Sequence, residues 1–171
     1  MHGLFNPAID KAKKRLGSGG ILGVINFDDR RYEDFIGQRG YERERIGKSA
    51  IYVPEKDILV VKGQEVPTQD GHILEMGLNY GVNLQRKRSL RDTIANALDE
   101  NGIIILDHPF YRDGAINYFR ENLNEMKKIS GMEIHNGEAA FGFKRVPILQ
   151  DNFPYGANEE AKKFYGYLIE T

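Results

Sequence analysis

Two short runs of almost entirely apolar residues constrain the fold of this chain most strongly. They are GILGVINF, residues 20–27, and IIILDH, residues 103–108. Apolar residues at consecutive positions over so short a run are typical of a strand that is covered on both faces, as in a parallel sheet flanked by helices. The segments around these runs then decide the architecture.

The remaining segments alternate between helical and strand patterns. Apolar periodicity and capping residues predict helices over residues 6–17, 89–102, 114–129 and 158–168. Further strands are expected at residues 50–53, 57–66, 72–78 and 132–137, and residues 28–48 are expected to form a loop with one helical turn. This order predicts an α/β fold built on a mostly parallel sheet.

Length and composition exclude several classes of protein. The 171 residues fit a single domain, and the absence of cysteine excludes disulfides and thiolate metal sites. A formal charge of −1 gives no overall attraction to nucleic acid or to an anionic membrane. We find no apolar run long enough for a membrane span and no signal-peptide pattern at the N-terminus, so we expect a cytoplasmic protein without membrane contact.

Several ionisable residues fall at the ends of the predicted strands. Asp29 follows the first strand, Glu65 closes a later one, His72 begins the next and His108 closes IIILDH. Each alone fits a surface side chain or an ion pair, but together they favour a single site, because ligands collect at strand ends in parallel α/β folds. Imidazole and carboxylate suit Mn, Zn or Fe, and two such ions activate water for attack on a phosphoryl group.

Basic residues offer candidate contacts for phosphate. The segment QRKRSLR places Arg86, Arg88 and Arg91 at the start of a predicted helix, where they and the helix amides can bind a phosphate or a nucleic-acid backbone. A solvated loop is the alternative. Arg112 lies four residues after His108 and is the candidate catalytic cation that neutralises substrate charge, the alternative being an ion pair with a nearby carboxylate.

Four segments resemble the polymerase-and-histidinol-phosphatase (PHP) family of metal-dependent phosphoesterases. They are the opening residues 1–17, KGQEVPTQDGHILEMGL (62–78), LDHPF (106–110) and MEIHNG (132–137). The resemblance implies that Glu65 is a metal-bridging ligand and that His72 and His108 bind the same ions. It also implies that His2 is the second member of a His-x-His pair and that Glu133 has a structural role.

The chain also departs from the family pattern. INFDDRR, residues 25–31, has no histidine where the family has one, so Asp28 or Asp29 would have to supply an oxygen ligand instead. The last ligand-bearing strand of the family has no counterpart before Thr171.

The resemblance implies a distorted, TIM-like β/α barrel. Because a complete eight-stranded barrel takes about 250 residues, we expect residues 1–171 to form one PHP-like domain without the first and last barrel strands. Open strand edges would then favour a homo-oligomer or a partner that completes the barrel.

The function that the resemblance implies is metal-dependent hydrolysis of a phosphate mono- or diester by a metal-activated water. The substrate is expected to be a phosphoester, with nucleotides and nucleic acid among the candidates. The alternative is a non-catalytic PHP-like binding or assembly module with an incomplete metal site, which the missing ligands favour.

Overall fold

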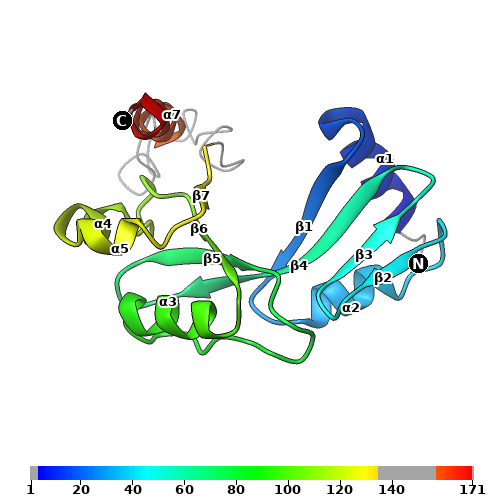
Figure 1. Ribbon diagram of the computed structural model, residues 1–171, viewed down its shortest axis with the longest axis horizontal. Coiled ribbons are helices and arrows are strands. Elements are labelled where there is room, and N and C mark those ends of the chain that lie inside the picture. Colours follow the sequence, from blue (N-terminus) through cyan, green and yellow to red (C-terminus); the bar gives the residue numbers. More distant parts are fainter. Residues whose placement is uncertain (1–3, 135–156, 171) are drawn as a thin grey trace, which may run out of the picture. The chain divides into compact units, whose positions relative to one another are not determined.

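The computed structural model describes residues 4–134 and 157–170 (Figure 1). The helices are α1 (Phe5–Leu16), α2 (Arg30–Ile36), α3 (Leu90–Asp99), α4 (Ile116–Glu121), α5 (Leu123–Met126) and α7 (Ala157–Glu170). The strands are β1 (Gly20–Asn26), β2 (Glu44–Ile46), β3 (Ala50–Val53), β4 (Ile58–Pro67), β5 (His72–Met76), β6 (Ile103–Leu106) and β7 (Gly131–Met132).

The strands form a mixed, open sheet, so the predicted mostly parallel, TIM-like barrel is wrong. The hydrogen-bonded order is β2-β3-β4-β5-β6-β7, with β1 paired to β4. The β1/β4 and β6/β7 pairs are parallel, whereas the β2/β3 and β3/β4 pairs are antiparallel. Within the described residues no pairing closes the order into a ring.

Short connections explain why a parallel barrel does not form. Residues 54–57 alone join β3 to β4, and residues 68–71 alone join β4 to β5. The amide of Asp57 donates to the carbonyl of Pro54, and that of Thr68 to the carbonyl of Gly71, so both connections are tight turns. A parallel connection needs a crossover of about a dozen residues or more, so hairpins form here instead.

The described chain divides into two compact units. The first comprises residues 1–65, 75–84 and 96–102, and the second comprises residues 66–74, 85–95 and 103–171. In the first unit β1 pairs with β4 from Gly20 opposite Ile58 to Asn26 opposite Gln64, and α1 and α2 contact β1. Its core consists of Phe5, Ile9, Ala12, Val24, Tyr32, Ile51, Val53, Ile58 and Val60.

The second unit buries a separate set of apolar side chains from its strands and helices. They are Val66, Ile73, Leu90, Ile94, Ile104, Leu106, Ala115, Ile116, Phe119, Ala157 and Ala161. The predicted single domain is untested by these observations and stays a prediction. The predicted homo-oligomer assumed an open barrel, and no feature of residues 4–134 and 157–170 supports it.

Several predicted elements differ in extent from those observed. The expected helix over residues 114–129 is interrupted at Asn122, whose side chain donates to the carbonyl of Tyr118 and whose backbone is not helical. Asn side chains compete with the helix in this way. The loop expected at residues 28–48 contains α2 and β2, and the predicted strand 132–137 runs partly outside the described residues. None of the described helices has the length and apolar character to cross a bilayer.

Candidate metal centre

Four side chains come together around the turn between β4 and β5 and the end of β6. Glu65, His72, Asp107 and His108 each offer one ligand atom, and these atoms all lie within 4.8 Å of one another. The imidazole rings of His72 and His108 meet edge to face with centroids 5.3 Å apart. Asp107 is buried and the other three are partly buried. Three of the four were predicted from the sequence, and the structure brings them together.

Local chain geometry places Glu65 and His72 close to each other. Glu65 is the last residue assigned to the first unit, but β4 continues from it without a break through Val66 and Pro67 of the second. The turn at residues 68–71 then reverses the chain into β5, whose first residue is His72. Two ligand-type side chains separated by a tight turn therefore face the same volume.

His72 is also anchored from the far side by the loop that follows Arg112. Its amide donates to the carbonyl of Asp113 at 2.8 Å, and it forms an isolated β-bridge with Gly114. Gly71, directly before it, has φ +126°, and a Cβ there would lie 2.6 Å from the Cα of Ala115. Only glycine fits this close approach, so His72 is held between two backbone segments.

His108 has a strained backbone that neighbouring groups hold in place. Its φ of 25° lies in the left-handed region, where a residue other than glycine costs about 1–3 kcal/mol. The Glu133 carboxylate accepts the His108 backbone N–H at 2.8 Å. Glu133 thus has a structural contact, as the family resemblance implied.

Asp107 orients the His108 ring. Its Oδ1 lies 3.0 Å from His108 Nδ1, whereas the Glu133 Oε2 lies 3.8 Å from the same nitrogen. A carboxylate in this position fixes the proton on Nδ1 and leaves Nε2 to bind a metal. Strain at His108 combined with an oriented ring is typical of a functional position.

The donor chemistry of the group suits one divalent ion. The imidazoles of His72 and His108 and the carboxylate of Glu65 are ligands that Zn, Mn and Fe accept, and three protein ligands leave room for water in the remaining positions. The group thus has the ligand types and the spacing for a divalent metal ion.

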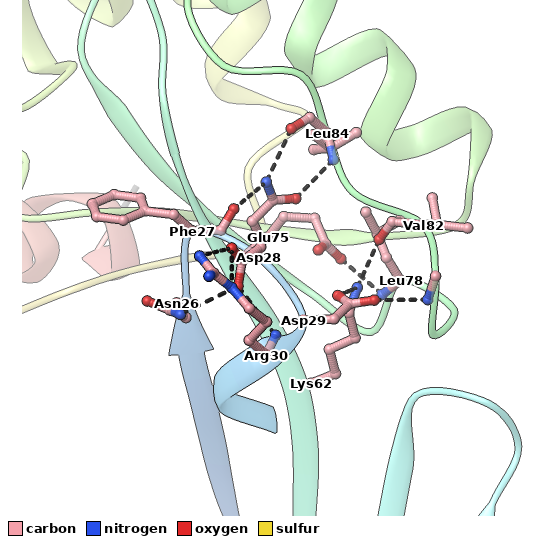
Figure 2. Close-up of polar contacts among 12 residues, drawn as sticks. Asn26, Phe27, Asp28, Asp29, Arg30, Lys62, Glu75, Leu78, Val82 and Leu84 are labelled. Carbon is pink, nitrogen blue, oxygen red and sulfur yellow. Dashed lines mark hydrogen bonds and ion pairs between the residues drawn. The ribbon is translucent and has the colours of Figure 1, made fainter. Parts of the chain in front are cut away.

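Asp29, predicted as a further metal ligand, is engaged elsewhere in the first unit. Its Oδ1 lies 2.8 Å from Lys62 Nζ, and its Oδ2 accepts the Gly81 N–H at 2.7 Å. Lys62 is 1% exposed. Its Nζ also donates to the carbonyl of Val82 at 2.7 Å, and Figure 2 draws this contact. This buried ion pair stands where the resemblance would have an oxygen ligand, and a metal-binding role for Asp29 stays a prediction.

The predicted phosphate contacts are all exposed. Arg112 lies 3.7 Å from Asp113, which fits the ion-pair alternative, and Arg91 lies 3.9 Å from Glu125. Arg86 and Arg88 lie on the exposed loop before α3. Their roles stay predictions, and His2 lies outside the described residues.

The helix amides that were expected to join in phosphate binding are already used. The Leu90 N–H donates to Asp70 Oδ2 at 2.8 Å, and the Asp92 N–H donates to Ser89 Oγ at 3.1 Å. The protein's own carboxylate and hydroxyl therefore cap the start of α3.

Asp107 is the one member of the four-residue group that was not predicted from the sequence. The signal was present, because Asp107 directly precedes His108 at the end of an otherwise apolar strand. A carboxylate directly after a buried strand is expected to be buried and therefore needs a hydrogen-bond partner. The adjacent His108 can be that partner.

Comparison with known proteins adds a distant likeness. No family model and no curated protein matches the chain. The lesion-specific endonuclease EndoQ of Pyrococcus furiosus is similar at 12% identity and a TM-score of 0.45, over 64% of this chain and 31% of that one. Endonuclease Q in complex with a 27-mer duplex substrate that has an abasic lesion at the active site is similar at 13% identity and a TM-score of 0.43. The similarity covers 61% of this chain and 30% of that one.

These likenesses are too weak to establish a fold or a function. The chain spans about a third of the length of both endonuclease structures, and both TM-scores lie below 0.5. Membership of the PHP family therefore stays a proposal, and the case for function rests on the four-residue group.

Proposed function

We propose that this chain is a metal-dependent phosphoesterase whose centre is formed by Glu65, His72, Asp107 and His108. The observation that carries the proposal is the convergence of four ligand atoms within 4.8 Å. These residues come from three separate stretches of sequence. A metal site needs several imidazole and carboxylate groups within a few ångström of one another, and this group of four side chains provides them.

The four side chains of the group would have different roles. Glu65, His72 and the Nε2 of His108 would hold the ion, while Asp107 keeps the proton of His108 on Nδ1. A bound divalent ion supplies Lewis acidity, which lowers the pKa of water and neutralises charge on a phosphoryl oxygen. Glu133 holds the strained backbone of His108 and so keeps its ring in place.

A polyanionic substrate is favoured by the basic loop before α3. The amide of Lys87 donates to the carbonyl of Pro67 at 2.8 Å, and that of Gln69 donates to the carbonyl of Arg88 at 2.9 Å. The loop is therefore fixed to the same turn that joins Glu65 to His72. Its exposed Arg86, Lys87 and Arg88 would contact phosphates that flank the reacting one.

Hydrolysis of bis(p-nitrophenyl) phosphate with added manganese tests the proposal. We expect turnover by the purified protein that a chelator abolishes and manganese restores. Glu65→Gln and His72→Ala should each reduce kcat at least about a hundredfold, since loss of one ligand weakens the site. Glu121→Gln, an exposed carboxylate at the end of α4, is the matched control and should leave kcat unchanged.

A second candidate function is a non-catalytic module that binds one ion. The Asp29–Lys62 ion pair favours this candidate. The carboxylate of Asp29, which the PHP resemblance would use as an oxygen ligand, is already bound to the Lys62 ammonium. Stoichiometric metal binding without hydrolysis of mono- or diesters would select this candidate. Absence of metal binding at micromolar ion concentration would exclude both.

A further inference from the structure

The first unit contains a cavity that the proposed metal chemistry does not use. Its volume is about 380 Å³, and its walls come from α2, from the β2–β3 hairpin and from the segment around Tyr80. Small-molecule sites commonly have volumes of about 300 to 1,000 Å³. The cavity is therefore large enough for a metabolite-sized ligand.

The walls of this cavity are fixed to one another by hydrogen bonds. The amide of Tyr80 donates to the carbonyl of Lys48 at 3.1 Å, which ties its segment to the hairpin turn. The next amide, that of Gly81, donates to Asp29, which directly precedes α2. Asp29 is in turn paired with the buried Lys62 (Figure 2). The cavity is thus preformed on a buried polar support.

The charge on the walls favours an anion. Arg45 and Lys48 line the cavity with a single acidic residue, Glu33. Arg45 lies on β2 opposite Ile51 of β3, which also lines the cavity, so the hairpin register fixes its direction. A guanidinium and an ammonium a few residues apart are the usual ligands of a phosphate group.

Two tyrosines line the cavity, and the exposed one, Tyr80, offers a ring face to a ligand. Tyr32 is 3% exposed and Tyr80 is 50% exposed, and both line the cavity. Burial raises the pKa of the Tyr32 phenol, so its hydroxyl stays neutral and can donate as well as accept. Aromatic faces beside cations suit a ligand with a planar ring, because stacking does not depend on the identity of the ring.

We propose that this cavity binds a small phosphorylated molecule with a planar ring, of which a nucleoside monophosphate is the representative class. Arg45 and Lys48 contact the phosphate, Tyr80 stacks on the ring, and Glu33 accepts a hydrogen bond from a hydroxyl or amino group. The proposal does not depend on the metal centre, since the residues that line the cavity are not members of the four-residue group.

Calorimetric titration in chelator-containing buffer tests the proposal, with adenosine 5′-monophosphate, adenosine and inorganic phosphate as probes. We expect the monophosphate to bind at least about tenfold more tightly than either fragment, a difference of about 1.4 kcal/mol. In an NMR titration the backbone amides of Gly47 and Tyr80 should shift. The His72→Ala variant should bind the monophosphate as the wild type does, which separates this site from the proposed metal function.

Variants then assign the contacts. Arg45→Gln should weaken monophosphate binding at least tenfold and leave adenosine binding unchanged, with Arg45→Lys intermediate. Tyr80→Ala should weaken both nucleoside ligands, and Tyr80→Phe should restore them. Arg15→Gln, an exposed cation in the last turn of α1, is the matched charge control.

Two results would overturn the proposal. One is the absence of monophosphate binding at millimolar concentration by the folded wild-type protein. The other is wild-type affinity in Arg45→Gln with an unchanged melting temperature, which would place the phosphate elsewhere.

Discussion

Burial changes the pKa of one carboxylate of the first unit, that of Glu75. Glu75 is fully buried on β5, where Oε1 accepts the Leu78 N–H at 2.9 Å. No donor among the described residues reaches its Oε2. Burial raises the pKa of Glu75 to about 7, an effect that the Leu78 amide and Lys62 oppose and that Asp29 reinforces.

The raised pKa of Glu75 predicts that stability falls as pH rises. Between about pH 4.5 and pH 7 the folded state holds a proton on Glu75 that the unfolded state has lost. The stability that Glu75 contributes is therefore fully present below about pH 4.5 and is lost as the pH rises through 7. Glu75→Gln should therefore be more stable than the wild type at pH 8, by up to about 3 kcal/mol, and similar at pH 4.5. Urea unfolding across this range checks it, and a difference independent of pH would contradict it.

The ion pair between Asp29 and Lys62 gives a second prediction at this scale. Asp29→Asn leaves a buried ammonium without its counter-charge and should destabilise the protein by about 3–5 kcal/mol. The double variant Asp29→Asn/Lys62→Met should lose less unfolding free energy than Asp29→Asn alone, because neither charge of the pair remains buried. Unfolding free energies from a double-mutant cycle measure this, and simple additivity of the two changes would be inconsistent with a coupled pair.

Much of the candidate site was predictable from individual residues. Glu65, His72 and His108 stood at strand ends, and the structure places them together with Asp107. The buried partners were not foreseen, because Lys62 and Gln64 occupy strand positions where alternation predicts apolar side chains. Their burial depends on the carbonyls of Val82 and Leu84, which lie about 20 residues away in the sequence.

Among the elements, the basic loop before α3 carries the clearest prediction. If Arg86 and Arg88 contact phosphates, replacing both with Gln should weaken binding to a DNA duplex and lower the slope of log K against log salt by about 1 per lost contact. Fluorescence anisotropy at several salt concentrations measures both quantities. An unchanged slope would remove the loop from the interface, and Arg15→Gln should behave as the wild type.

The positions of the main helices and strands were predictable from the sequence, but the direction in which the strands pair was not. The buried strands and the first helix were placed within a few residues of their observed bounds. Pairing direction depends on connection length, and the segment at residues 54–57 is too short for a crossover helix. The strand predicted at residues 57–66 was assigned to a mostly parallel sheet, whereas β4 pairs in parallel with β1 and antiparallel with β3.

At the scale of the whole molecule, the two units have different proposed tasks. The first supports a preformed cavity on a buried ion pair, and the second holds three of the four residues of the candidate metal centre, with Glu65 joined to it through β4. Failure of one site need not impair the other, since each depends on its own contacts.

X-ray absorption spectroscopy of the protein loaded with one equivalent of zinc tests the proposed metal centre. We expect two imidazole nitrogens at about 2.0–2.1 Å together with oxygen ligands, and one imidazole fewer in His72→Ala. A spectrum without imidazole, or one that His72→Ala leaves unchanged, would show that Glu65, His72, Asp107 and His108 do not form the metal centre.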